Sequence, residues 1–234
     1  MKKLLSLIVV VLFLGSLFAV ESDPSEVVGY VEYSCVFDAV AGDYNLIAIP
    51  MNAGYTLASE LGSDYPSITS IRHWDNVAQS WVASDNLGGG FWWPDNAIVE
   101  NEVYYINVDA NTDIYIAGGM NADPSYSLVS DPVLGDYNAI MLPLDSAFTL
   151  ASELGNDIGV CTSIREWDNV AQSWVASDNL GGGFWWPDNP VAIAGAYYIN
   201  VSANTTWPTV LRSASTVVPA EIKNLNMTNK KVRK

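Results

Sequence analysis

WDNVAQSWVASDNLGGGFWWPDN, residues 74–96, is repeated without a single difference at residues 167–189. Near its start, Trp74 and Trp81 lie symmetrically about the bond between Val77 and Ala78. A hairpin that turns at this bond places the two tryptophans directly opposite each other, because paired strands match residue for residue and side chains alternate between faces. The stretch therefore predicts a β-hairpin, followed by a turn that is rich in glycine.

The repeated stretch is the best-preserved part of a longer internal duplication. A shift of 93 residues aligns residues 42–112 with residues 135–205 without a gap. This period is too long for a solenoid, whose repeats have about 20–50 residues. It indicates two tandem copies of a small domain, or two halves of one pseudo-symmetric domain. We expect unit 1 at residues 20–121 and unit 2 at residues 122–211.

Strand signals dominate both units. One short segment of unit 1, residues 56–61, has the spacing of a helix, with Thr56 as a candidate N-cap and Gly62 as a stop. The expected strands are residues 27–37, 44–51, 67–74, 79–84, 102–108 and 113–117. Each unit is therefore expected to hold four to six antiparallel strands and one short helix, in the mainly β class or the α+β class.

The two ends of the chain differ from its body. Residues 1–19 carry two lysines before an apolar run, which is the layout of a secretory signal peptide. Residues 212–234 are basic and poorly patterned, and we expect them to form a flexible tail. The protein is thus expected to be secreted, extracellular or on the cell surface. No other segment approaches the roughly 20 apolar residues of a membrane-spanning helix, so we do not expect the processed chain to span a membrane.

Charge is distributed unevenly. Of the 26 acidic residues, 25 lie between residues 20 and 211, where Arg72 and Arg165 are the only basic residues. A body with this excess of negative charge repels nucleic acid and anionic membrane surfaces, which makes both poor partners. Cations and neutral ligands such as sugars remain compatible with it.

Two interpretations of the tryptophan pair in the hairpin differ in which face of the sheet is wet. In the first, Arg72, Trp74 and Trp81 form an exposed platform on which sugar rings stack through their apolar C–H faces. In the second, the tryptophans are core. Position 73 favours the second, because it is histidine in unit 1 and glutamate in unit 2, and glutamate is rarely buried without a partner. Arg72 then needs a partner inside, for which Asp75 is the nearest candidate.

The second half of the repeated stretch, GGGFWWPDN, does not fit a purely core role. Trp92 and Trp93 are adjacent, so in extended backbone they point to opposite sides and one core cannot enclose both. At least one tryptophan of each unit is expected at a surface, where it packs on the sister unit or meets a ligand. The predicted ligand-binding residues are Trp92, Trp93, Asp95, Asn96, Trp185, Trp186, Asp188 and Asn189.

Residues for catalysis or for a cofactor are scarce. His73 is the only histidine and is replaced by glutamate in unit 2, so a histidine base or a zinc site lacks its parts. Paired carboxylates for glycoside hydrolysis stay open as an alternative, although most acidic residues lie in turns. Asp109-Ala-Asn-Thr-Asp113 has the start of a calcium loop without its glycine and late glutamate. We expect no catalytic residue and no cofactor, with calcium as a weak alternative.

The two cysteines, Cys35 and Cys161, do not occupy equivalent positions in the duplication. Either they form a disulfide, which joins the first strand of unit 1 to unit 2, or both are buried free thiols.

The segments NLIAIP, WDNVAQSWV and YYINV resemble a class of secreted bacterial repeat modules with the pattern NLIxxP, WDxxxQSW and GxYYxNV. The resemblance covers both units but not the tail, and it implies extracellular or cell-surface β-rich modules with no assigned chemistry. The glycine that the pattern expects before the last strand is Glu102 in unit 1 and Gly195 in unit 2. We therefore expect the entry into this strand to differ between the units.

These features favour a non-enzymatic binding module with carbohydrate as the leading ligand class and an extracellular glycan or a surface protein as the partner. The rival is a structural or adhesive surface protein whose tryptophans only pack the core and the contact between units, and an enzyme comes third. Recent copying of DNA between the repeats would also produce identical stretches without any function.

Overall fold

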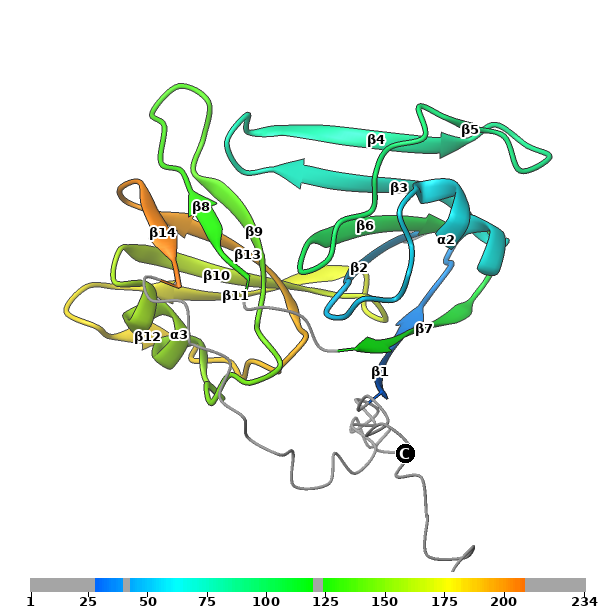
Figure 1. Cartoon of the computed structure of the whole chain (residues 1–234). Helices are drawn as coiled ribbons and strands as arrows, with labels where there is room; N and C mark the ends of the chain where they lie inside the picture. Colours follow the sequence, from blue (N-terminus) through cyan, green and yellow to red (C-terminus); the bar gives the residue numbers. More distant parts are fainter. Residues whose placement is uncertain (1–27, 40–42, 120–123, 209–234) are drawn as a thin grey trace, which may run out of the picture.

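The computed structural model describes residues 28–39, 43–119 and 124–208. The signal peptide and the tail that the sequence predicts lie outside these residues. The described chain is mainly β and confirms the predicted fold class, because two similar units each contain a five-stranded antiparallel sheet with one short helix beside it (Figure 1).

Unit 1 forms its main sheet in the order β2-β6-β3-β4-β5, while β1 and β7 pair as a separate two-stranded sheet. Its elements are β1 (Val28–Cys35), β2 (Tyr44–Ala48), α2 (Ala58–Asp64), β3 (Ile68–Asp75), β4 (Ser80–Asn86), β5 (Trp92–Trp93), β6 (Val103–Val108) and β7 (Thr112–Gly119). These seven strands exceed the predicted four to six, because the two-residue strand β5 is too short to leave a periodic signal.

Unit 2 repeats this arrangement, with the main sheet in the order β9-β13-β10-β11-β12 and a separate pair of β8 and β14. Its elements are β8 (Tyr126–Leu128), β9 (Tyr137–Met141), α3 (Ala151–Ile158), β10 (Cys161–Asp168), β11 (Ser173–Asn179), β12 (Trp185–Trp186), β13 (Ala196–Val201) and β14 (Thr205–Trp207). Every sheet thus takes its strands from one unit only.

The hairpin has the predicted register, since Trp74 pairs with Trp81 across β3 and β4. Its turn is built by Asp75, whose Oδ1 accepts hydrogen bonds from the N–H groups of Val77 and Ala78 at 2.8 Å each. Gln79 closes the turn with a φ of 49°. The identical turn in unit 2 follows from the identical sequence.

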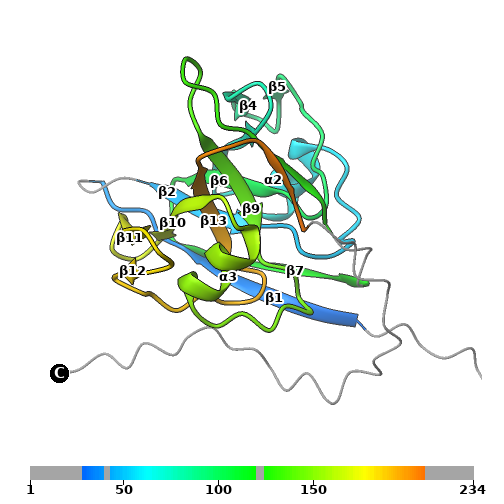
Figure 2. The ribbon, with the colours of Figure 1, turned by 90° about the vertical axis from the view of Figure 1, so that its left-hand side faces the viewer.

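One face of each main sheet carries the core. In unit 1, Ile47, Ile71 and Ile106 project from this face and are almost fully buried, as is Leu61 of α2. The helix begins where the Pro-Asp-Asn turn reaches it, because the Asn96 carbonyl accepts a hydrogen bond from the N–H of Ala58 at 2.9 Å. The opposite face of each main sheet is turned toward the other unit, as the two views in Figures 1 and 2 show together.

The two cysteines are both free thiols, so the alternative of a disulfide between Cys35 and Cys161 is not realised. Each replaces a buried aliphatic side chain of the other unit, Leu128 and Ile68 respectively. Burial raises the pKa of each thiol to about 12. Both cysteines therefore act as small core residues.

Candidate functional site

Each hairpin reaches across to the edge strand of the other unit. The Asn76 side chain donates from Nδ2 to the carbonyl of Ala139 at 3.0 Å and accepts from the N–H of the same residue at 2.7 Å. An edge strand such as β9 has backbone N–H and carbonyl groups with no partner strand. The Asn76 amide bonds both groups of Ala139 and so takes the place of a neighbouring strand. Asn169 makes the equivalent pair with Leu46, at 3.3 Å to the carbonyl and 2.8 Å from the N–H.

Two further side chains of the hairpin complete this contact. Trp74 Nε1 and Gln79 Nε2 both donate to the carbonyl of Tyr137, at 2.8 and 2.7 Å. Trp167 and Gln172 do the same to Tyr44, each at 2.8 Å. Each unit thus uses the same side chains to bond the equivalent residue of the other unit, as in a two-fold symmetric dimer contact. We call the six side chains that form it the inter-unit latch: Trp74, Asn76, Gln79, Trp167, Asn169 and Gln172.

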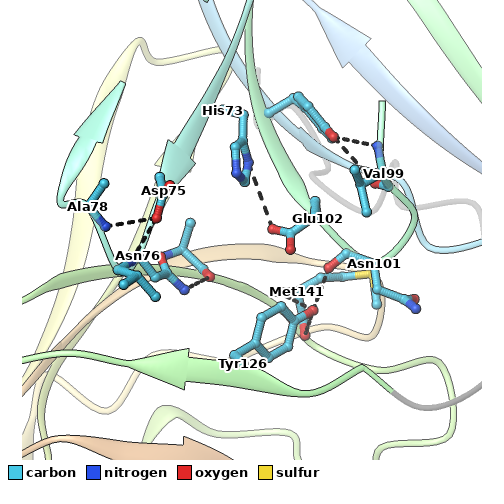
Figure 3. Close-up of polar contacts among 12 residues, drawn as sticks. His73, Asp75, Asn76, Ala78, Val99, Asn101, Glu102, Tyr126 and Met141 are labelled. Atoms are coloured by element: carbon cyan, nitrogen blue, oxygen red, sulfur yellow. Dashed lines mark hydrogen bonds and ion pairs between the residues drawn. The ribbon is translucent and has the colours of Figure 1, made fainter. Parts of the chain in front are cut away.

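A second reciprocal contact joins β1 and β8 to the turns that precede β13 and β6 of the other unit. Tyr126 of β8 donates to the carbonyl of Asn101 at 2.6 Å and lies beside Met141 (Figure 3). In the other direction, Tyr33 of β1 donates to the carbonyl of Ala194 at 2.9 Å. Asn101 and Ala194 are equivalent residues of the two units, so this contact obeys the same pseudo-symmetry.

Between the two hairpins lies a cleft of about 550 Å³. We call it the inter-unit cleft. It is lined by five residues of each unit that correspond under the shift of 93: Tyr44, Arg72, Trp74, Trp81 and Tyr105, with Tyr137, Arg165, Trp167, Trp174 and Tyr198. Its volume lies within the range of about 300–1,000 Å³ that is usual for ligand sites in proteins.

The rings of the cleft meet at steep angles. Tyr105 and Tyr198 are buried and lie 6.1 Å apart between their ring centroids, where the two units meet. Trp81 stands 5.5 Å from Tyr105 at an interplanar angle of 72°, and Trp174 stands 5.6 Å from Tyr198 at 82°. Trp81 and Trp174 remain 46% and 44% exposed. The cleft therefore has a floor of tyrosine and walls of tryptophan that water still reaches.

Polar groups are placed among these rings. The Nε atoms of Arg72 and Arg165 donate to the hydroxyls of Ser70 and Ser163, both at 3.3 Å. The floor residues Tyr105 and Tyr198 add two phenol hydroxyls to the lining. Burial raises the pKa of both phenols, so they stay protonated and able to donate to a ligand.

The residues predicted from GGGFWWPDN are divided by the fold. Trp92 and Trp185 are core side chains at 4% exposure, whereas Trp93 and Trp186 are 66% exposed. The latter pair lies beside the glycine-rich loops of β5 and β12, at opposite ends of the molecule (Figures 1 and 2). The structure therefore does not bring the two predicted sets together into one site.

The acidic and amide residues of the predicted set have structural partners. Asp95 Oδ1 accepts from the N–H of Ser59 in the first turn of α2 at 2.9 Å, and Asp188 makes the equivalent bond to Ser152. Asn96 Nδ2 donates to the carbonyl of Ala83 at 2.7 Å, and Asn189 repeats this in unit 2. The turn thus fixes the helix to the edge of the sheet.

The prediction that the hairpin tryptophans are core is wrong for Trp81 and Trp174, and only partly right for Trp74 and Trp167, which are half-buried. His73 is itself half-buried, at 29% side-chain exposure, so the argument from position 73 did not identify a single wet face. Glu166 is exposed, as the argument requires, but Trp81 and Trp174 on the opposite face are exposed as well, so both faces are partly wet. Asp75, the suggested partner of Arg72, instead holds the turn.

The candidate site contains residues that the sequence did not reveal. Tyr44 and Tyr105 belong to strands that were predicted, but their position beside Arg72 depends on β6 lying between β2 and β3. The one indication in the sequence was the internal duplication, because Tyr44 and Tyr105 recur as Tyr137 and Tyr198 after the shift of 93 residues.

One polar group breaks the symmetry of the two units. His73 Nδ1 lies 3.8 Å from Glu102 Oε2 in unit 1 (Figure 3). The equivalent residues of unit 2 are Glu166 and Gly195. Because glycine stands where unit 1 has Glu102, position 195 brings no second carboxylate to Glu166 at this short distance. The entry into the last strand nevertheless keeps its backbone bonds, since Ile49 and Leu142 donate to the carbonyls of Glu102 and Gly195 at 3.0 Å each. Gly195 also donates from its N–H to the carbonyl of Ala192 at 2.9 Å, and a Cβ at Gly195 would lie 2.7 Å from that oxygen, so the backbone of unit 1 differs at Glu102.

The pair predicts a pH dependence of stability. Burial, with a smaller contribution from the charge of Asp75, raises the pKa of Glu102 to about 7 from the ordinary value of 4.5. The folded chain holds this proton more tightly, so the stability that Glu102 contributes is lost as the pH rises from about 4.5 through 7. His73 has the opposite effect on the pH dependence of stability. Burial lowers its pKa, so the stability that it contributes rises with pH.

Comparing the parent with the Glu102→Gln variant isolates the glutamate, since His73 is present in both proteins. We expect the variant to gain stability relative to the parent between pH 5 and pH 8 in urea unfolding experiments. A difference that stays constant or falls over this interval would contradict the assignment.

The weak calcium alternative finds no support in the side-chain contacts of its residues. Asn111 Oδ1 accepts from the N–H of Phe37 at 2.8 Å, and Asp113 Oδ1 accepts from the Ser34 hydroxyl at 2.9 Å. Among residues 28–39, 43–119 and 124–208, no group of three or more histidine, cysteine, aspartate or glutamate side chains is arranged to hold a metal ion. Within the same ranges, no helix has the length and apolar character needed to cross a membrane.

Comparison of the chain with protein-family models, with curated proteins and with solved structures finds no match. The resemblance to secreted bacterial repeat modules therefore stays a prediction.

Proposed function

We propose that this chain is a secreted or cell-surface carbohydrate-binding protein without catalytic activity, and that the inter-unit cleft is its binding site. The supporting observation is the composition of the cleft, which takes two tryptophans, two tyrosines and one arginine from equivalent positions of each unit. The proposal moves the predicted site from the glycine-rich loops to the hairpins.

The chemistry of the cleft suits sugars for two reasons. Aromatic faces pack against the apolar C–H faces of sugar rings, and such rings supply a large contact area with a fixed geometry. The hydroxyls of Tyr105 and Tyr198 and the guanidinium groups of Arg72 and Arg165 can hydrogen-bond sugar hydroxyls from the same cleft. A few convergent polar groups in a largely apolar pocket are the usual pattern of a small-ligand site.

Binding to a glycan array is the first test, followed by calorimetry of the Trp81→Ala/Trp174→Ala variant with the best ligand. Buried contact tryptophans contribute about 2 kcal/mol or more to binding, so we expect affinity to fall at least ~30-fold. The matched control is Trp93→Ala/Trp186→Ala, which removes two exposed tryptophans outside the cleft. We expect its affinity to stay within about twofold of the parent.

Three results would count against the proposal. A parent protein that binds no glycan removes the function and favours the rival, in which the rings only join the units. Loss of binding in the Trp93/Trp186 variant alone moves the site to the glycine-rich loops. Undiminished binding by a folded Trp81/Trp174 variant excludes the cleft.

A further inference from the structure

The inter-unit cleft concentrates the positive charge of the body. Arg72 and Arg165 are the only basic residues between residues 20 and 211, and both line the cleft. None of the ten residues that line it is acidic, although the same part of the chain has 25 aspartates and glutamates. The local charge of the cleft is therefore opposite to that of the chain around it.

Other cavities among the described residues show the charge expected of so acidic a chain. One is lined by Glu100 and Glu102, a second by Asp145 and Asp157, and a third by Asp109. The inter-unit cleft thus differs from these cavities, because its lining contains no carboxylate.

The two arginines are held on the walls of the cleft. Each Nε atom donates to a serine two residues earlier on the same strand, Ser70 or Ser163. The Arg165 guanidinium also lies 6.0 Å from the ring centroid of Tyr137. Since Nε is engaged by serine, the terminal Nη groups are the donors that remain for a ligand, and a guanidinium matches the two oxygens of a carboxylate or of a sulfate.

We propose that the ligand of the cleft is an anionic sugar, with at least two rings that carry a carboxylate or a sulfate. This inference rests on the proposed carbohydrate-binding function. The sugar rings pack against Trp81 and Trp174, and the anionic groups pair with Arg72 and Arg165. Two equivalent guanidiniums related by the pseudo-symmetry favour a ligand with two anionic groups, such as an oligouronide.

The negative charge of the whole chain does not prevent this binding. At physiological ionic strength the Debye length is about 8 Å, so exposed carboxylates beyond that distance are largely screened. A partly buried guanidinium in direct contact with the ligand is screened much less. The local contact therefore determines the preference, and it should weaken as salt is added.

Calorimetry with four probes tests the inference: tetragalacturonate, its methyl ester, a heparin-derived tetrasaccharide and cellotetraose. The ester keeps the sugar skeleton of the first probe and removes its charge. We expect an anionic probe to bind at least ~10-fold more tightly than the ester and cellotetraose, and this ratio to shrink between 0.05 and 0.5 M salt. Tight binding of tetragalacturonate shows that carboxylates suffice, whereas binding of only the heparin-derived probe, which carries carboxylates and sulfates, shows that sulfates are needed.

Variants assign the preference to the arginines. In Arg72→Gln/Arg165→Gln the ratio of acid to ester affinity is expected to fall close to one, and Arg72→Lys/Arg165→Lys should recover part of it. Leu87→Glu/Leu180→Glu makes the same change of net charge on two exposed side chains outside the cleft, so this control should keep the ratio.

The outcomes separate the two proposals. Equal binding of acid and ester, or a folded glutamine variant that keeps the ratio, overturns the anionic ligand and leaves the carbohydrate function standing. A parent protein that binds none of the four probes and no glycan of the array overturns both.

Discussion

Replacing Trp92 with alanine is expected to lower the free energy of unfolding by about 3–5 kcal/mol, the usual cost of removing a large aromatic side chain from a core. The Trp92 side chain is 4% exposed and packs on α2 at Gly62. A Cβ at Gly62 would overlap the indole ring, so the glycine is what allows this close approach. Gly155 and Trp185 repeat the contact in unit 2.

The neighbouring residue is the matched control. Trp93 lies on the same two-residue strand but is 66% exposed. Its replacement by alanine is expected to change the free energy of unfolding by about 0.5 kcal/mol or less. Guanidinium unfolding of the two variants measures the difference, and equal effects would show that the two tryptophans are not on opposite sides of the strand in solution.

Removing the two asparagines of the inter-unit latch is expected to have an effect of similar size. Asn76 and Asn169 each satisfy both the N–H and the carbonyl of one edge-strand residue in the other unit. Each of these four hydrogen bonds contributes about 0.5–1.5 kcal/mol net, so Asn76→Ala/Asn169→Ala should cost about 2–6 kcal/mol in total.

Asn86→Ala provides the control for this variant. Asn86 Oδ1 accepts a hydrogen bond from the N–H of Gly88 at 3.0 Å, within unit 1. We expect a loss of about 1 kcal/mol or less in urea unfolding. If the double latch variant is no less stable than Asn86→Ala, the latch does not hold the units together.

The latch also accounts for part of the identity between the two repeated stretches. Trp74, Asn76 and Gln79 bond the other unit, and Asp75 builds the turn that presents them. A change in one copy alone would break one side of a reciprocal contact. Structural constraint is therefore an alternative to recent copying of DNA for the first half of the stretch.

Much of the fold could be predicted from local patterns. The hairpin register followed from the spacing of Trp74 and Trp81, and the divided fates of Trp92 and Trp93 followed from the alternation of side chains along a strand. The helix was placed within a few residues, although Glu60 rather than Thr56 caps its start, by accepting from the N–H groups of Thr56 and Leu57.

The candidate site could not be predicted in the same way, because it depends on how two units face each other. Nothing in the sequence places Tyr105 of one unit 6.1 Å from Tyr198 of the other. Asp95 and Asn96 looked available to a ligand because turn residues are polar, but the turn uses them to hold α2 and β4. The two arginines were visible as the only basic residues of the body, without any indication that they share a cleft.

The most direct test of the central claim, that sugars bind between the units, is a titration followed through the indole N–H signals of ¹⁵N-labelled protein. The chain has nine tryptophans, which single Trp→Phe variants can assign. With the glycan that binds best on the array, we expect the signals of Trp81 and Trp174 to shift together, while those of Trp93 and Trp186 stay in place. Shifts confined to Trp93 and Trp186, or a saturating ligand that moves neither cleft signal, would contradict the account.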